Sequence, residues 1–252
     1  HFQRTTAWAT DGVPLGGYGY PAKPNGLICS MFRPSDDATV FPYLIPSNFF
    51  AYNSLWKLHL MAEKSNSLEW RNLVKESASI LTSIEKSLMK EAVIENKEFG
   101  RIFAFEVNGF GSYHLMDDSN IPSLLSLNYL LDNKYPNQKE DVFANTRKFI
   151  LSESNPFFFK GKSAEGIGGP HCGMDMIWPM SIIMRGLTST DDKEIKLCLD
   201  MLQRTHAGTG FMHESFHKDD PTNFTRKWFA WANTLFGEFV WKVYRERPHL
   251  LN

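Results

Sequence analysis

The sequence lacks several features that would each indicate a class of function. Its longest apolar runs are far too short to span a bilayer, so no membrane segment is expected. The 27 lysines and arginines nearly balance the 28 aspartates and glutamates, and no run of basic residues exceeds two. Because positive charge is nowhere concentrated, no nucleic acid is expected as a partner.

Cysteine is also scarce. Cys29, Cys172 and Cys198 form neither a disulfide framework nor a CxxC-type zinc site. The chain begins at His1 without a basic segment followed by an apolar one, so it contains no readable targeting signal. We interpret this start as a cut rather than a natural one, and the compartment and the oligomeric state stay open.

The motifs of several enzyme classes are missing as well. The sequence has no GxSxG nucleophile elbow and no P-loop. His213, Glu214 and His217 do match the HExxH spacing of zinc peptidases, which requires a helix that places both histidines on one face. Glycine, aspartate and proline crowd both sides of this segment, so no helix is expected there. We treat the match as chance and expect no metal; a zinc peptidase is the alternative.

Aromatic residues, in contrast, are abundant: they make up 14% of the chain, with seven Trp and twenty Phe. Many of them are expected in the core. Aromatic faces also stack on the C–H faces of sugar rings, while Trp and Tyr keep a polar group for hydrogen bonding. Composition alone leaves both uses open.

Hydrophobic periodicity predicts about seven helices separated by long loops rich in glycine and proline. The N-caps expected for three of them are Ser47, Ser67 and Ser189. Residues 101–107 alternate like a short strand. The expected fold class is therefore mainly α, with at most two or three short strands. The predicted helices cover about residues 48–63, 67–92, 122–131, 139–151, 174 or 176 to 185, 190–206 and 228–245.

Two loops carry carboxylates suited to acid–base chemistry. In the first, Asp36 and Asp37 follow Arg33, and repulsion between neighbouring carboxylates can keep one of them protonated, as a general acid requires. The alternative is a solvated turn in which one aspartate caps a local N–H. In the second loop, Glu214 lies beside His213 among aromatics and could polarise a water. Its alternative is a surface ion pair.

Two further loops offer groups that bind polar ligands. In residues 168–180, His171, Asp175 and Trp178 could supply a donor, an acceptor and a stacking surface for a sugar. Alternatively, Asp175 caps a helix and Trp178 fills core. In residues 108–123, the Asp117-Asp118 pair is expected to line a cleft and to cap the helix predicted from Pro122.

Taken together, these segments resemble glycoside hydrolase family 125, the exo-acting α-1,6-mannosidases. The resemblance is carried by GLICSMFRPSDDATVFPYLIPSNFFA (26–51), LMDDSNIPSLL (115–125), GGPHCGMDMIWPM (168–180) and MHESFHKDDPTNFTRKWFAWANTLFGE (212–238). It implies an (α/α)6 toroid, which needs more helices than the sequence provides. Residues 1–252 are therefore expected to form a single catalytic domain that lacks its N-terminal part.

The resemblance also implies an inverting mechanism and a set of site residues. Inversion needs a general acid and a general base whose carboxyl groups lie roughly 6.5–9.5 Å apart, so that a water fits beside the base. The acid maps onto the Asp36-Asp37 pair, with Asp36 preferred, and the base maps onto Glu214. No cofactor or metal is implied, and the expected partner is a mannose-containing glycan. A carbohydrate-binding fragment without catalysis is the non-enzymatic alternative. The expected mannose subsite comprises Arg33, His171, Asp175, Trp178, His213, Arg226 and Trp228.

Overall fold

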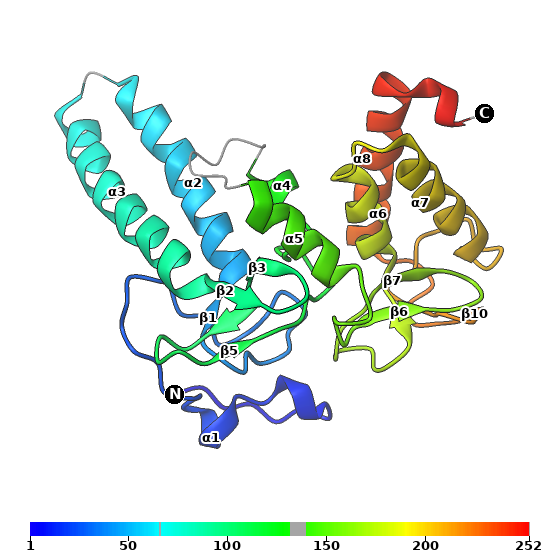
Figure 1. Ribbon diagram of the computed structural model, residues 1–252, viewed down its shortest axis with the longest axis horizontal. Coiled ribbons are helices and arrows are strands. Elements are labelled where there is room, and N and C mark those ends of the chain that lie inside the picture. Colours follow the sequence, from blue (N-terminus) through cyan, green and yellow to red (C-terminus); the bar gives the residue numbers. More distant parts are fainter. Residues whose placement is uncertain (66, 132–139, 252) are drawn as a thin grey trace. The chain divides into compact units, whose positions relative to one another are not determined.

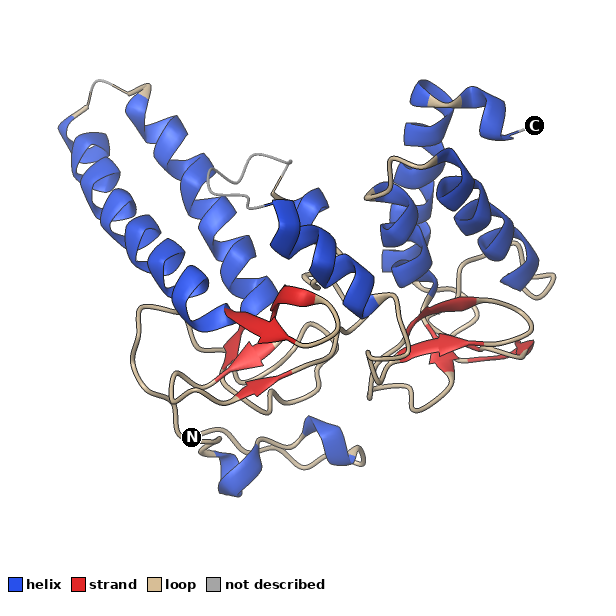
Figure 2. Ribbon diagram, viewed as in Figure 1, coloured by secondary structure: helices blue, strands red, loops and turns tan. Residues whose placement is uncertain are grey.

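The computed structural model describes residues 1–65, 67–131 and 140–251, and it is mainly helical with short strands (Figures 1 and 2). The predicted mainly α fold class is confirmed, but the described residues form ten short strands instead of the two or three expected. The chain divides into two compact units. Unit 1 comprises His1–Leu115 and Leu130–Thr146, and unit 2 comprises Met116–Tyr129 and Arg147–Asn252. Each unit is described below by itself.

Two long antiparallel helices dominate unit 1, α2 (Ile45–Glu63) and α3 (Leu68–Ser87), the latter continued by a π-helical turn, η2 (Leu88–Ala92) (Figure 1). The Ser67 hydroxyl accepts a hydrogen bond from the Trp70 amide at 3.2 Å, which confirms the predicted N-cap of α3. The predicted cap at Ser47 is wrong. Helix α2 begins before it, with Pro46 in the first turn, where a missing N–H costs no hydrogen bond.

Short antiparallel strands lie beside these helices in unit 1. Strands β1 (Tyr43–Leu44), β4 (Glu106–Val107) and β5 (Tyr113–His114) form one sheet in the order β1-β4-β5. Strand β2 (Val93–Asn96) pairs with β3 (Gly100–Phe103). The single strand predicted over 101–107 is therefore two strands, because the chain changes its pairing partner between β3 and β4. The remaining short helices of this unit are η1 (Ala9–Asp11) and α1 (Pro14–Gly17).

Aromatic packing forms the core of unit 1. The rings of Phe49, Phe103 and Phe143 meet edge to face, with the centroid of Phe103 5.0 Å from each of the other two. Phe143 lies in α5 (Glu140–Ile150), which ends one residue before the helix predicted over 139–151; residue 139 lies outside the described residues. The Phe103 amide also donates to the hydroxyl of Thr146 in α5.

Unit 2 combines three helices with two small sheets. Helix α6 (Pro179–Leu187) packs against α7 (Asp192–Thr205) and α8 (Ala230–Glu246), and η3 (Pro248–Leu251) follows. A β-carbon on Gly186 of α6 would lie 2.3 Å from the ring of Phe239, so only glycine allows this close approach to α8. The sheets are β10-β9-β8, from Asp220–Phe224, Phe216–His217 and Met176–Ile177, and β6 (Phe158–Lys160) with β7 (Glu165–Ile167).

Some predicted helix boundaries are wrong, and long-range contacts explain why. Only α4 (Leu127–Leu130) is helical within the predicted helix 122–131, because the Asp117 carboxylate binds the amides of Leu124 and Leu125 in a turn. Helix α6 begins at Pro179 because Met176–Ile177 pair with β9. Helix α7 is capped by Asp191, whose carboxylate accepts from the Lys193 amide at 3.0 Å, and not by Ser189.

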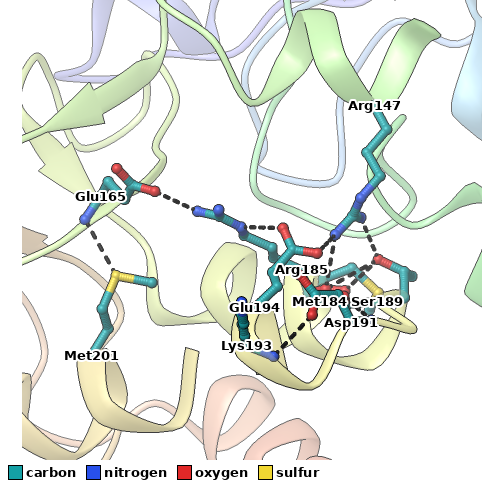
Figure 3. A network of polar contacts seen from close by, with 10 residues as sticks. Arg147, Glu165, Met184, Arg185, Ser189, Asp191, Lys193, Glu194 and Met201 are labelled. Atoms are coloured by element: carbon teal, nitrogen blue, oxygen red, sulfur yellow. Dashed lines mark hydrogen bonds and ion pairs between the residues drawn. The ribbon is translucent and has the colours of Figure 1, made fainter. Parts of the chain in front are cut away.

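A partly buried network of charged side chains connects β7, Arg147 near the end of α5, α6 and α7 in unit 2 (Figure 3). Glu194 accepts from Arg185 Nε at 2.7 Å and from Arg147 Nη2 at 2.8 Å, and Arg185 Nη1 reaches Glu165 at 2.8 Å. Burial alone would raise the pKa of Glu194, but hydrogen bonds from Ser189 and Arg185 and the charge of Arg147 lower it to about 2.

No helix within residues 1–65, 67–131 and 140–251 combines the length and the apolar character that crossing a bilayer requires.

Candidate active site

The loop of residues 33–41 in unit 1 carries the predicted acid pair. The Arg33 amide donates to the Asp37 carbonyl at 2.8 Å and the Asp36 amide donates to the Arg33 carbonyl at 3.1 Å, which makes a tight turn. Asp36 is exposed and has a φ of +71°, a left-handed conformation that aspartate tolerates better than most residues. Asp37 is only 1% exposed, and its Oδ2 accepts from the Ser35 hydroxyl at 2.7 Å. The two aspartates therefore have different surroundings.

Glu106 is a residue that the sequence reasoning missed. This fully buried carboxylate in β4 accepts from Arg33 Nε at 2.7 Å and from the amides of Val40 and Phe41 at 2.9 and 3.1 Å. Burial alone would raise the pKa of Glu106, but hydrogen bonding from His114 and the charge of Arg33 hold it below its usual value. The signal in the sequence was one acidic residue in an otherwise apolar alternating segment.

Arg33, a predicted subsite residue, is 5% exposed and forms a buried ion pair with Glu106. Its guanidinium carbon lies 5.3 Å from the centroid of the Phe105 ring. Within the part of the chain that the structure describes, Arg33 Nη2 has no hydrogen-bond partner. This buried donor therefore lacks the partner that buried polar groups usually have.

The predicted base lies in unit 2, where two extended segments run side by side. The Glu214 amide donates to the Arg226 carbonyl at 3.4 Å, and the Thr225 amide donates to the Ser215 carbonyl at 3.0 Å. The Glu214 side chain is 8% exposed, and its Oε1 lies 3.3 Å from Arg226 Nε. Glu214 is therefore a largely buried carboxylate whose arginine partner is mostly exposed.

His213 precedes this carboxylate and is 1% exposed. Its ring lies parallel to that of Phe224, with a centroid separation of 3.9 Å, and its Nδ1 lies 2.9 Å from the Lys227 carbonyl. A carbonyl only accepts, so Nδ1 carries the proton and donates. Burial lowers the pKa of His213, which favours the neutral ring; in the tautomer protonated at Nδ1, the buried Nε2 is an acceptor.

The HExxH residues do not share a helix. His213 and Glu214 lie outside any helix and His217 lies in β9, which confirms the expectation that no helix forms in this segment. The Asp219 amide donates to His217 Nδ1 at 3.2 Å. The geometry that a zinc peptidase requires, two histidines on one helical face, is therefore missing here.

Arg226 and Trp228, two other predicted subsite residues, are exposed. The Arg226 side chain is 64% exposed and its guanidinium carbon lies 5.6 Å from the centroid of the Phe229 ring. Trp228 is 56% exposed and precedes α8. Both side chains are therefore accessible to solvent, and Arg226 also contacts Glu214.

The three predicted residues of the 168–180 loop have different surroundings. The Trp178 ring is 2% exposed and meets Phe229 edge to face at 5.9 Å, which agrees with the alternative that it fills core. His171 is half-buried, 6.2 Å from the Trp178 ring. Asp175 does not cap a helix: it has a φ of +64°, and its Oδ1 lies 3.5 Å from Lys218 Nζ.

The Asp117-Asp118 pair is fully buried in unit 2. Asp117 accepts from the amides of Leu124 and Leu125 at 2.7 and 2.9 Å, and burial raises its pKa to about 8 against the lowering effect of these donors. Asp118 Oδ1 accepts from the amide of Asn120. Asp117 therefore binds backbone amides as predicted, but it stabilises a turn and not a helix that starts at Pro122.

The chain is similar to known proteins in three comparisons. The family model "Metal-independent alpha-mannosidase (GH125)" matches residues 1–241. The chain is 43% identical over 252 residues to the "Meiotically up-regulated gene 157 protein" of Schizosaccharomyces pombe, covering 99% of this chain and 48% of that protein. It is 38% identical, with a TM-score of 0.91, to a solved metal-independent alpha mannosidase of Streptococcus pneumoniae in a non-productive substrate complex with alpha-1,6-mannobiose. That match covers 97% of this chain and 57% of the solved chain, so the chain spans about half the length of these relatives.

Proposed function

The chain belongs to the GH125 family of metal-independent α-mannosidases, and we therefore propose that it is the catalytic part of an exo-acting glycoside hydrolase that releases mannose from α-1,6-linked mannosides with inversion. We also propose that residues 1–252 form part of an (α/α)6 toroid and act as a single catalytic domain. The observation that carries the proposal is the close structural match to a mannosidase bound to α-1,6-mannobiose.

In this proposal Asp36 is the general acid and Glu214 is the general base. Asp36 combines an exposed carboxyl with a left-handed backbone, and unusual backbone conformations of this kind cluster at functional sites. Asp37 is the alternative acid, although its carboxyl is buried against Ser35. Glu214 suits a base because its carboxylate is largely withdrawn from solvent and has a cationic neighbour in Arg226.

The chemistry is a single displacement at the anomeric carbon. The acid transfers its proton to the glycosidic oxygen as the bond from that oxygen to the anomeric carbon breaks. Glu214 takes a proton from a water, whose oxygen forms the new bond to the opposite face of the same carbon. Room for that water requires the two carboxyl groups to lie roughly 6.5–9.5 Å apart in the active protein.

The proposed mannose subsite keeps the residues expected from the sequence, with different contributions. Arg226 and Trp228 are accessible, and His213 Nε2 is an acceptor suited to a sugar hydroxyl. Asp175 and His171 offer further polar groups. Arg33 contributes through its unpaired Nη2, and Trp178 contributes by packing against Phe229.

The stereochemistry of the first product tests the reaction. Full-length protein is mixed with α-1,6-mannobiose, and the anomeric protons are followed by NMR before mutarotation. We expect β-mannose to appear first. If α-mannose appears first, the inverting mechanism is wrong, and if no mannose is released, the chain is better explained as a carbohydrate-binding fragment.

Substitution of the two carboxylates tests the assigned roles. We expect Asp36→Asn and Glu214→Gln each to lower kcat by about 10²–10⁴-fold, the usual contribution of a general acid or base, while mannobiose binding measured by calorimetry survives. Asp37→Asn distinguishes the two aspartates. Glu246→Gln, which removes an exposed ion pair with Lys242 in α8, is the control and should keep the original rate. Wild-type rates for all the aspartate and Glu214 variants would refute the assignment.

A further inference from the structure

Glu106 has no place in the chemistry proposed above, yet it is the most completely enclosed carboxylate near the acid loop. It is 0% exposed and lies in β4, and three groups of residues 33–41 donate hydrogen bonds to it: Arg33 Nε and the amides of Val40 and Phe41. Burial of a carboxylate is unfavourable unless its oxygens are paired with hydrogen-bond donors or cations. The contacts of Glu106 meet that condition on both oxygens.

The two oxygens of Glu106 hold opposite ends of the loop. Oε1 accepts from the Arg33 side chain, where the loop begins, at 2.7 Å. Oε2 accepts from the amides of Val40 and Phe41, where the loop ends, at 2.9 and 3.1 Å. His114 Nδ1 lies 3.5 Å from Oε2 and adds a further contact on the same side. The Glu106 side chain therefore joins the beginning and the end of the loop of residues 33–41.

Within the loop, backbone hydrogen bonds connect Arg33 to both aspartates. The Asp36 amide is bound to the Arg33 carbonyl, and the Arg33 amide is bound to the Asp37 carbonyl. Any displacement of Arg33 therefore moves both aspartates. Misplacement of a reacting group by about 1 Å costs on the order of 100-fold in rate.

We infer that Glu106 is a positioning residue for the general acid: it clamps both ends of the 33–41 loop and so presents the acid carboxyl to the glycosidic oxygen. This inference rests on the proposed function. The competing explanation is that Glu106 only stabilises unit 1. The two explanations predict different results when the clamp is removed. Loss of positioning slows the step that needs general acid catalysis, whereas loss of stability lowers the rates of all reactions alike.

The variant Glu106→Gln removes the clamp with little change in shape. Glutamine has a single acceptor oxygen, so its NH₂ group must face either the Arg33 Nε–H or the amides of Val40 and Phe41. One end of the loop is then released and faces a repulsive donor–donor contact. Glu106→Asp keeps the charge but shortens the reach, and it serves as a second variant if the first folds poorly.

Two substrates that differ in their leaving group separate positioning from stability. Cleavage of α-1,6-mannobiose needs protonation of the departing sugar oxygen. The leaving group of 2,4-dinitrophenyl α-mannoside, 2,4-dinitrophenolate, departs as a stable anion without a proton. We expect Glu106→Gln to lower kcat/KM on mannobiose by about 10- to 100-fold and on the dinitrophenyl substrate by less than about threefold, since only the first reaction uses general acid catalysis. The ratio of the two rates is independent of the fraction of folded protein.

Matched variants show which idea has failed. Glu194→Gln breaks two partly buried ion pairs in unit 2 and should lower stability without changing the ratio. If Glu106→Gln and Glu106→Asp leave the ratio unchanged, or abolish both reactions, the inference is overturned. In that case Asp36→Asn or Asp37→Asn still shifts the ratio if the proposed function is right. If neither aspartate variant shifts it, the proposed function has failed as well.

Discussion

At the scale of single residues, His213 shows how packing determines a protonation state. The ring is enclosed, stacked on Phe224, and its Nδ1–H is taken up by the Lys227 carbonyl. A charged imidazolium would lose hydration that this environment does not replace, so burial lowers the pKa of His213. The residue therefore enters the proposed subsite as a neutral ring with one acceptor nitrogen.

This predicts a specific titration. In ¹H–¹³C NMR spectra, the Cε1–H signal of His213 should shift with a midpoint below the ordinary histidine pKa of about 6.5. Because its pKa in the folded state is depressed, His213 contributes stability that is present above about pH 6.5 and is lost as the pH falls through the folded value. The His213→Gln variant assigns the signal by its disappearance. A midpoint above the ordinary value would contradict the tautomer and the burial described here.

At the scale of secondary-structure elements, the sequence predicted what local periodicity controls. Helices α3 and α8 and the cap at Ser67 follow from apolar spacing and side-chain capping within a few residues. The errors occur where a distant residue competes for the backbone. The amides of Leu124 and Leu125 donate to Asp117 and so are not available to a helix from Pro122. Met176 and Ile177, which precede α6, pair with β9.

The same distinction holds for the candidate site. The sequence predicted the loops that carry Asp36 and Glu214, because these loops are rich in acidic, basic and aromatic residues. The burial of Trp178 and the clamp made by Glu106 depend on contacts between residues far apart in the sequence. Glu106 and Arg33, for example, are separated by 73 positions. No local pattern encodes such a pairing.

The network around Glu194 yields a prediction about four elements together. The pKa of Glu194 is lowered from 4.5 to about 2, so its ion pairs stabilise the folded state above about pH 4.5. This contribution, about 3 kcal/mol for a shift of that size, is lost as the pH falls through about 2. The free energy of unfolding, measured by urea denaturation, should therefore decrease as the pH falls from about 5 to about 3.

The variant Glu194→Gln should be less stable at neutral pH, because Arg185 and Arg147 lose their shared partner, and its stability should depend less on acid. Asp200→Asn, in the same helix α7, removes only a half-exposed pair with Lys196 and serves as the control, with an expected change below about 1 kcal/mol. An equal pH dependence in the protein with and without Glu194 would show that the network does not act in this way.

At the scale of the whole molecule, membership of a metal-independent family and the local geometry of the HExxH residues lead to the same expectation. A zinc peptidase presents two histidines on one helical face, whereas His213 lies in a loop with its Nδ1 bound to a carbonyl, and His217 lies in β9. We therefore expect EDTA or phenanthroline to leave mannobiose hydrolysis by the full-length protein unchanged. His217→Ala should likewise keep the rate, because that residue has no part in the proposed chemistry, whereas a zinc enzyme would lose activity in both experiments. Stoichiometric zinc by elemental analysis, together with loss of activity on chelation and recovery when zinc is restored, would contradict this view of the molecule.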